Sequence, residues 1–372
     1  MHAVAVIVGA GVILAALVDA FETILQPRRV THRFQLARLY YRGMWWAWRV
    51  GASMLRGRTR QAFLGAFGPL SLLGLFASWI LWLILGFAVL NAGAGTVLTG
   101  ALHHNFSDYL YASGTTLFTL GYGDVTPAGG FGRALAVLES GMGFGFLAAV
   151  IGYLPVLYQA YSAREVVISQ MDARASSPPS AGEVLLRLAR ARRADDMDDL
   201  LAAWERWAAE LLESQLSFPV LSYYRSQHDN QSWLAMLAAI LDTCAILLAR
   251  RRGDNLYQTE MTFAMARHAA VDLTLVLKTS IRRPATDRLG PGDLEWLRES
   301  LEKEGETFRP DDTRLAELRS TYEPFLQALA RRLLFALPPV VVRGEAIDNW
   351  QRSSLGRAPA IGELTSGDED HF

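Results

Sequence analysis

The stretch TTLFTLGYGDVTP, residues 115–127, is unusual for a soluble protein because two glycines bracket a tyrosine and an aspartate follows at once. Gly121 and Gly123 can adopt backbone angles that are closed to other residues. The apolar segment directly before them, which ends near Phe118, is too short to cross a bilayer. This combination favours a backbone loop that is held inside protein or against water at membrane depth.

The hydropathy of the chain divides it into a membrane part and an aqueous part. Of the 372 residues, 51% are hydrophobic, and the excess falls almost entirely before residue 163. A helix needs roughly 20 residues to cross a bilayer. Three stretches are long enough: Ala3–Leu25, Phe67–Leu90 and Phe131–Leu157.

The first apolar stretch is predicted to be a retained membrane anchor. It lacks the basic start and the small-residue cleavage site of a secretion signal, and it runs into Asp19 and Glu22. These two acids share one face close to the end of the stretch. Their usual role would be solvation at the interface or pairing with the basic segment that follows, and attraction of cations is the alternative.

The distribution of charge predicts the orientation in the membrane. The chain has no acidic residue between Glu22 and Asp108, and its arginines gather between residues 28 and 60. Basic loops stay in the cytoplasm, so we expect the N-terminus outside and everything after Tyr161 in the cytoplasm. The connection between residues 91 and 105 contains no Asp, Glu, Lys or Arg, which agrees with an outer location.

The basic segment, residues 28–65, interleaves arginines with aromatic residues such as Tyr40, Trp45 and Trp48. This mixture is typical of a helix that lies in the interface on anionic lipid. Voltage sensors place arginine at every third position of a transmembrane helix, and the irregular spacing here predicts weak voltage dependence.

A short helix is expected between the second and third apolar stretches. Ser107 or Asp108 would cap it, and it would end near Phe118 after about a dozen residues, or roughly 20 Å. Such a segment enters the membrane, breaks at the glycines and returns. Carbonyl oxygens of the returning loop, contributed by several chains around an axis, can replace the water shell of a monovalent cation.

Residues 119–124, TLGYGD, resemble the filter signature of potassium channels, TVGYG. The resemblance implies a homotetramer around one pore and K⁺ as the permeant ion, with no cofactor. It places the cation sites at the main-chain oxygens of Thr119, Leu120, Gly121 and Tyr122, and at the Thr119 hydroxyl. It also implies that Gly123 belongs to the filter, that the Tyr122 side chain points away from the axis, and that Asp124 lies at the outer mouth. Leu120 replaces the usual valine, and Phe118 stands where threonine is common.

The third apolar stretch carries the expected gate. Gly143 falls where the inner helix of potassium channels carries its hinge glycine, and close helix packing is the equal alternative. Leu147, Ile151 and Pro155 share one helical face with Gly143 and are predicted to form the cavity wall and a hydrophobic constriction. The alternative role of this stripe is contact with the outer helix. Pro155 is also expected to interrupt and bend the helix.

Glu139 is an acid inside the same stretch, where acids are costly and usually functional. Its surroundings are similar to the inner helix of bacterial inward-rectifier channels, in which a polar residue lies behind the filter. We expect Glu139 to brace the filter or the pore helix through hydrogen bonds, with Thr115 or Thr116 as candidate partners, or to add negative charge near the cavity. The likeness ends with the pore, because inward rectifiers have a β-sandwich cytoplasmic domain and this sequence does not predict one.

The sequence from Arg164 onward predicts an all-α cytoplasmic domain. The turn-rich stretch ASSPPSAG, residues 175–182, is a boundary within it, and Ser180 is expected to cap the helix that follows. The domain contains no GxGxxG motif after a strand, so we expect no nucleotide-binding domain, and nothing indicates a nucleic-acid partner. The predicted helices cover residues 183–194, 195–216, 231–252, 257–281, 293–304 and 313–337.

Enzymatic chemistry is not expected in this domain. His228 with Asp229, and His268 with Asp272, fall short of the full ligand set of a metal-dependent phosphohydrolase. The single cysteine, Cys244, excludes an intrachain disulfide. Aromatic residues are expected to pack the bundle core: Trp204, Trp207, Trp233, Tyr257 and Phe263.

The sequence as a whole predicts an all-α integral membrane protein of the cell membrane, a potassium-selective channel with three transmembrane helices, a re-entrant pore helix and a filter loop. Two alternatives remain, a non-selective cation channel and a membrane-anchored signalling or ligand-sensing module whose cytoplasmic regulator is unknown. The predicted organisation is an additional transmembrane helix (1–27), a basic interfacial segment (28–65), a pore module (66–163), a cytoplasmic helical domain (164–345) and a disordered tail (346–372).

Overall fold

The computed structural model describes residues 2–24, 36–101, 105–193, 196–227, 230–249, 256–282 and 287–344. It divides into two compact units, residues 1–159 and 160–372, which are treated separately below. The described residues are overwhelmingly helical, so the all-α prediction is confirmed. The predicted tail, residues 346–372, lies outside the described residues.

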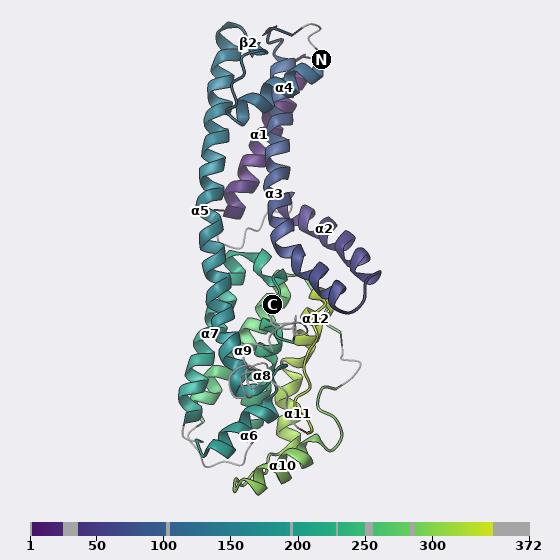
Figure 1. The fold of residues 1–372 in the computed structure, drawn as a ribbon, viewed down its shortest axis with the longest axis vertical. Helices are drawn as coiled ribbons and strands as arrows, with labels where there is room; N and C mark the ends of the chain where they lie inside the picture. The colour runs from purple at the N-terminus through teal and green to yellow at the C-terminus, as the bar shows by residue number, and fades with distance from the viewer. Residues whose placement is uncertain are drawn as a thin grey trace, which may run out of the picture. The chain divides into compact units, whose positions relative to one another are not determined.

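Three helices of the first unit are long and apolar enough to cross a membrane: α1 (His2–Ile24), α3 (Gly57–Gly93) and α5 (Gly129–Ala175). Both α3 and α5 extend beyond the predicted apolar stretches, since the flanking residues continue the helix although they are more polar. α5 also continues unbroken through Pro155, where an interruption was expected. In Figure 1, α1 and α3 lie side by side along most of α1.

Small residues allow α1 and α3 to approach closely, as is common between membrane helices. A Cβ atom added at Gly9 of α1 would lie 2.7 Å from the carbonyl oxygen of Gly86 of α3, which a real side chain could not tolerate. Next to this contact, Ile13, Leu83 and Phe87 form a hydrophobic cluster. Leu117, from the short helix α4 (Phe106–Leu117), joins the same cluster and so ties α4 to the two long helices.

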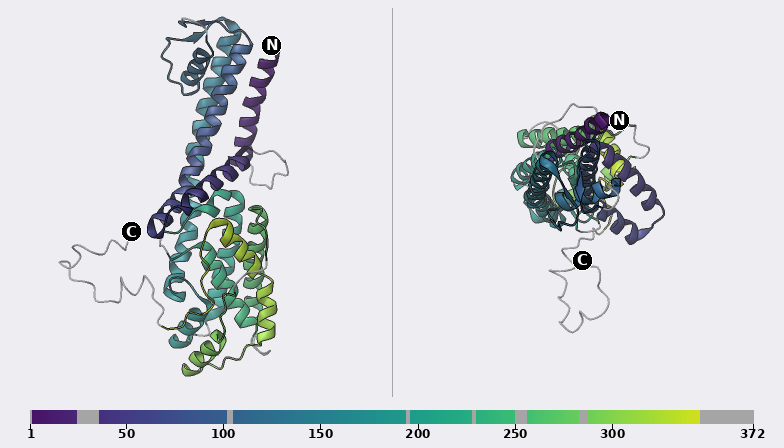
Figure 2. Two further views of the ribbon diagram at one scale, coloured as in Figure 1. Left: turned by 90° about the vertical axis from the view of Figure 1, so that its right-hand side faces the viewer. Right: turned by 90° about the horizontal axis from the view of Figure 1, so that it is seen from above.

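Helix α2 (Leu36–Ser53) packs one face on the beginning of α3 and lies oblique to it (Figure 2). Trp48 stacks on Phe63 with ring centroids 4.3 Å apart and donates its indole N–H to the carbonyl oxygen of Phe63 at 2.9 Å. Trp45 is buried edge-on against Phe67. The predicted basic segment is therefore divided between α2 and the first turns of α3 in the structure.

A two-stranded antiparallel sheet frames the loop that follows α4. β1 (Leu98–Thr99) pairs with β2 (Thr126–Pro127), with Leu98 opposite Pro127. The hydroxyls of Thr99 and Thr126 are 2.6 Å apart and add a side-chain hydrogen bond to this pairing. The sheet fixes the point at which the chain leaves the loop between α4 and α5.

The second unit is a helical bundle around α8. Every residue of α8 from Trp233 to Leu247 is buried, as expected for a helix that is apolar on all sides. Trp204, Trp207, Trp233 and Phe263 pack in the core as predicted, but Tyr257 is exposed at the first turn of its helix. The helices of this unit, after the end of α5, are α6 (Ala181–Ala191), α7 (Met197–Ser217), α8 (Trp233–Leu248), α9 (Tyr257–Val276), α10 (Asp293–Lys303), α11 (Asp312–Ser320) and α12 (Glu323–Leu333), with a 3-10 helix η2 (Pro219–Tyr223).

The single helix predicted over residues 313–337 is wrong. Helix α11 ends at Ser320 and a separate helix, α12, begins at Glu323. Pro324 explains the break, because proline lacks an N–H group and its ring clashes with the carbonyl four residues earlier, whereas the first turn of a new helix accepts it. The expected cap of α6 is confirmed, since the Ser180 hydroxyl accepts from the N–H of Glu183 at 3.3 Å.

A buried ion-pair network holds α8 to the C-terminal helices. Arg288 donates to Asp242 of α8 at 2.8 Å and to Glu323 of α12 at 2.6 Å. The hydroxyl of Tyr322 donates to the same Asp242 at 2.7 Å. The side chains of Arg288, Asp242 and Glu323 are 6%, 1% and 7% exposed, so each charge depends on its partners rather than on water.

Candidate ion-conduction site

Helix α4 leads into the loop, and hydrogen bonds fix the N-terminal end of this helix. Its cap is Asn105, two residues before the predicted Ser107, and the carboxylate of Asp108 accepts from the N–H of Asn105 at 3.0 Å. Asp108 therefore closes the first turn from inside the helix instead of preceding it. The hydroxyl of Tyr109 donates to the carbonyl oxygen of Thr96 at 2.8 Å and anchors the same end to the loop after α3.

The loop begins with hydrogen bonds to the last turn of α4. The N–H of Thr119 donates to the carbonyl oxygen of Thr116 at 3.0 Å, and the N–H of Leu120 donates to that of Thr115 at 2.9 Å. Thr115 and Thr116 thus hold the start of the loop through their main-chain oxygens. Their own hydroxyls donate to the carbonyl oxygen of Ala112, at 3.0 and 2.7 Å.

The backbone of the loop alternates in handedness. Thr119, Gly121 and Gly123 have φ of 56°, 62° and 77°, while Leu120 and Tyr122 between them do not have positive φ. In an ordinary extended chain successive carbonyls point to opposite sides, and a left-handed residue at every second position turns them to the same side. A β-branched residue such as Thr119 is rarely left-handed, at a cost of roughly 1–3 kcal/mol. The strain is of the kind found at functional sites.

The side chains of the loop are exposed in the single chain. Tyr122 is 69% exposed and Leu120 is 52% exposed, so neither packs on its own chain. Asp124 is different, because its carboxylate accepts from the hydroxyl of Tyr111 on α4 at 2.8 Å. This bond ties the end of the loop to the helix that precedes it.

Glu139 is buried on α5 and contacts Ser113 of α4, not Thr115 or Thr116 as expected. The Ser113 hydroxyl lies within hydrogen-bond distance of the Glu139 carboxyl group and also 3.0 Å from the carbonyl oxygen of Ile84 on α3. The threonine hydroxyls are occupied within α4, which explains why they do not reach Glu139. One small polar residue therefore joins three helices behind the loop.

A small polar cavity lies beside this contact. It has a volume of about 10 Å³ and is lined by Asn91, Ser113, Thr116 and Glu139, among others. This volume is at the lower limit for one water molecule. The amide oxygen of Asn91 is buried and has no hydrogen-bond partner among the described residues, so a bound water would satisfy it.

Gly143 is a contact between α5 and α4. A Cβ atom added there would overlap the carbonyl oxygen of Leu117 and lie 2.8 Å from the carbonyl carbon. At Gly141 and Gly145 an added Cβ would meet no other atom within 4 Å. The structure therefore gives Gly143 the packing role that was one of its two predicted roles.

The predicted gate stripe is solvent-accessible in the single chain. Leu147 and Ile151 are 56% and 62% exposed, and Pro155 on the same face is also exposed. The opposite face of α5 is covered, since Tyr153 packs edge-on against Phe76 of α3. The alternative role of the stripe, contact with the outer helix, is not realised within one chain.

Asp19 is not solvated at the interface, and no arginine side chain among the described residues, which exclude positions 25–35, pairs with it. It is buried, and its carboxylate accepts from the indole N–H of Trp79 on α3 at 2.8 Å and from the N–H of Ala37 in α2 at 2.9 Å. The negative charge at the N-terminal end of α2 is favourable because unpaired N–H groups point there. Asp19 thus connects α1, α2 and α3.

Sequence reasoning missed Ser113, Tyr111 and Trp79. The stretch from residue 107 to 119 contains several hydroxyl side chains, and the sequence does not fix which of them the rotation of α4 turns towards residue 139. The signal for Trp79 was a polar indole group inside an apolar span, which usually needs a partner when buried. Asp19 is an acceptor of the required kind.

The histidine pairs do not form a metal site in the part of the chain that the structure describes. His268 and Asp272 approach to 3.9 Å on one face of α9, and His268 is largely exposed. Within the described ranges no cluster of His, Cys, Asp and Glu side chains could hold a metal ion. His228 and Asp229 lie outside the described residues.

Comparison with known proteins assigns this region to a family. Residues 77–159, from the middle of α3 through α4 and the loop to α5, match a protein family described as ion channel. The resemblance to pore-loop channels is therefore confirmed for this segment. No solved structure gives a significant match.

Curated relatives extend the comparison. A Bacillus subtilis (strain 168) protein described as uncharacterized membrane protein YdjJ is 26% identical over 237 residues, 61% of this chain and 66% of the relative. Protein LctB of Bacillus caldotenax is 34% identical over 90 residues, and protein LctB of Geobacillus stearothermophilus is 33% identical over 94 residues. These two alignments each cover 21% of this chain and 66% of the relative. The matches support a location in the membrane.

Proposed function

We propose that this protein is a potassium-selective channel in which four copies surround one pore, as in other channels with this filter sequence. The alternating backbone of residues 119–123 carries the proposal. Main-chain oxygens of Thr119, Leu120, Gly121 and Tyr122, together with the Thr119 hydroxyl, replace the water around K⁺. The helix α4 ends at this loop, and its C-terminal partial negative charge also favours a cation.

The exposure of the first unit supports assembly from several copies. Only 6% of the most apolar window of α5 is buried within one chain, compared with 44% for α3. Pore-loop channels generally assemble as oligomers, and neighbouring copies would cover the exposed face of α5 and the side chain of Tyr122. Leu147, Ile151 and Pro155 then line the cavity below the filter, where a hydrophobic constriction can gate by dewetting.

The contact between Glu139 and Ser113 is proposed to brace the filter from behind. Replacing Glu139 with alanine removes the polar partner of Ser113 and leaves a space beside α4. We expect Glu139→Ala to alter single-channel conductance or the ratio of K⁺ to Na⁺ permeability. Single-channel recordings identical to those of the unmodified protein would remove Glu139 from the mechanism.

The proposed topology follows the arginines. The N-terminus is outside, α2 lies in the inner interface on anionic lipid, and the second unit is a cytoplasmic domain that contributes to assembly or gating. α2 has exposed apolar residues, including Leu39 and Trp46, and its arginines Arg38, Arg42 and Arg49 are exposed as well. This distribution suits a helix that contacts lipid tails and headgroups.

Ion flux from liposomes that contain the purified protein tests the proposal. We expect flux that is selective for K⁺ over Na⁺ and is blocked by Ba²⁺. Equal K⁺ and Na⁺ flux would indicate a non-selective cation channel. A well-folded tetramer without flux would favour a membrane-anchored signalling module.

A substitution in the filter tests whether its backbone conformation is needed for selective flux. Gly121 has φ of 62°, which alanine adopts only with strain, so Gly121→Ala should abolish selective K⁺ flux. Gly11→Ala is the matched control, because an added Cβ at Gly11 of α1 meets no atom within 4 Å. Normal flux in Gly121→Ala with intact assembly would contradict the role of the backbone.

A further inference from the structure

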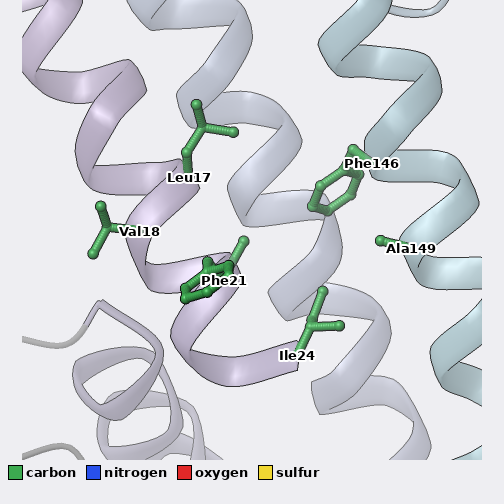
Figure 3. A pocket seen from close by; sticks show the side chains of 7 residues that line it. Leu17, Val18, Phe21, Ile24, Phe146 and Ala149 are labelled. Atoms are coloured by element: carbon green, nitrogen blue, oxygen red, sulfur yellow. The ribbon is translucent and has the colours of Figure 1, made fainter. Parts of the chain in front are cut away.

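An apolar groove separates α1 from α5 within the first unit (Figure 3). It has a volume of about 420 Å³, and Figure 3 shows Phe146 and Ala149 extending from α5 towards α1. Both helices belong to the candidate membrane spans. Hydrocarbon rather than water is the favoured filling of such a groove. The α1 side of the groove includes Leu17, Val18, Phe21 and Ile24.

A basic surface is attached to the same turn of α1. Asp19, between the groove residues Val18 and Ala20, accepts from the N–H of Ala37 and so fixes the first turn of α2 there. Arg38 directly follows Ala37, and Arg42 lies one helical turn further along the same exposed face. Since the chain has no acidic residue between positions 22 and 108, an anionic group is the complementary partner of this face.

A chain of contacts connects the basic surface with the groove. The indole of Trp79 donates to Asp19 at 2.8 Å, and its ring meets the ring of Phe146 edge-on with centroids 6.1 Å apart. Phe146 immediately precedes Leu147 of the proposed gate stripe. A molecule that bridges Arg38 and the groove would therefore act on both ends of this chain of contacts.

We propose that the groove binds an acyl chain of an anionic phospholipid whose phosphate group lies at Arg38 and Arg42, and that this lipid controls the position of α5. The lipid supplies both parts that the site requires, an apolar chain for the groove and a negative headgroup for the arginines. The regulatory part rests on the proposed channel function. The binding part does not.

Photocrosslinking of the full-length protein tests binding without using ion flux. The probe is phosphatidylglycerol with a diazirine on one acyl chain, at a few per cent in phosphatidylcholine vesicles, and the modified peptides are identified by mass spectrometry. We expect crosslinks within residues 17–24 and 146–149. Phosphatidylcholine carrying the same diazirine should give about tenfold fewer crosslinks.

Variants locate the two parts of the site. Ala149→Phe fills the groove and should lower crosslinking about tenfold, and Arg38→Gln combined with Arg42→Gln should lower it comparably. Arg133→Gln, an exposed arginine near the beginning of α5 and outside α2, is the matched control and should crosslink like the unmodified protein. If Ala149→Phe fails to fold, the lipid site is tested by the crosslink positions in the unmodified protein and by crosslinking of the arginine variants.

The outcomes distinguish the lipid site from the channel. Equal crosslinking of both lipids, or crosslinks that fall only outside residues 17–24 and 146–149, would overturn the proposed site. K⁺ flux that does not change with the phosphatidylglycerol content, in protein that crosslinks as expected, would overturn the regulatory role. Absence of flux in every lipid with normal crosslinking would refute the channel function and leave the lipid site standing.

Discussion

The two units differ in how far a single chain buries their central residues. In the second unit every residue of α8 from Trp233 to Leu247 is inaccessible to solvent, and its charged residue Asp242 has two partners in the same unit. In the first unit the loop residues 119–124 and the stripe of Leu147 and Ile151 are exposed. Within the described residues, one chain thus buries the central helix of the bundle, whereas it leaves the loop and the stripe of the first unit exposed.

This difference predicts which property substitutions in each unit change first. The bundle is stabilised by contacts that a single chain makes with itself, so its substitutions should change stability first. In the first unit, the loop with left-handed residues is exposed in a single chain and adds little to that chain's stability. Substitutions in this loop should therefore change conduction first. The following predictions test that contrast.

The largest effect is expected at the contact between α4 and α5. Gly143→Val places carbon atoms where the carbonyl group of Leu117 now lies and forces α4 away from α5. Overpacking typically costs about 1–3 kcal/mol. Because α4 carries the filter, we expect liposome K⁺ flux to fall by roughly 5- to 150-fold, the change that such an energy produces in an equilibrium.

Gly141→Val is the control for this variant, since a Cβ there meets no atom within 4 Å in the chain. It should conduct nearly as well as the unmodified protein. An equal loss of flux in both variants would show that flexibility of the glycine-rich stretch matters more than its contact with α4.

A large effect on stability is expected in the second unit. Arg288→Met leaves the carboxylate of Asp242 buried without its cation and leaves Glu323 with Arg319 alone, 3.8 Å away; breaking a buried pair typically costs about 3–5 kcal/mol. Cys244, the only cysteine, is fully buried, and burial raises the pKa of its thiol. We therefore expect a maleimide to label Cys244 in Arg288→Met at temperatures at which the unmodified protein is protected.

Arg314→Met removes an exposed ion pair with Glu317 and should leave this labelling unchanged, because surface pairs contribute little. Protection of Cys244 in Arg288→Met would mean that the network is not needed for the bundle. If Arg288→Met lost K⁺ flux at temperatures at which Cys244 is still protected, the proposed contrast between the units would be contradicted.

The smallest effect is expected in how the folding stability of the second unit decreases at acid pH. Burial alone raises the pKa of Glu323, but hydrogen bonds and the charge of Arg288 outweigh it, so the pKa lies below its ordinary value of 4.5. Stability from such a carboxylate is complete above the ordinary pKa and is lost as the pH falls through the lowered one. Circular dichroism melting of the full-length protein should show this loss below about pH 4.5 and a flatter dependence in Glu323→Gln. An unchanged acid dependence would exclude Glu323 as its source.

Periodicity and composition predicted the elements of the fold because membrane spans and buried helices leave strong signals. The three long apolar helices, the short helix before the loop and most helices of the bundle were expected from hydropathy and breaks, whereas α11 and α12 were predicted as one helix. The boundary errors have local causes. Polar residues such as Arg58 and Arg60 continue α3 beyond its apolar part, and Pro324 begins a helix where the apolar pattern continued.

The candidate site was only partly accessible from the sequence. The filter residues follow from their order alone, because the chemistry is in the backbone. The partners of Glu139 and Asp19 could not be predicted, since they depend on how helices far apart in the chain are rotated. Asp19 meets Trp79 across 60 positions and Glu139 meets Ser113 across 26.

The run without acidic residues around α2 has a consequence for how the protein meets its surroundings. Guanidinium groups do not lose their proton at any pH that a cell experiences, and the sequence between Glu22 and Asp108 has no carboxylate that could gain one. Acidification would therefore leave the cationic character of Arg38, Arg42 and Arg49 intact. Dissolved ions are the effective antagonist, because at physiological strength they damp exposed charges within about 8 Å. A rise in salt concentration therefore weakens the attraction between this face and an anionic group more than a fall in pH does.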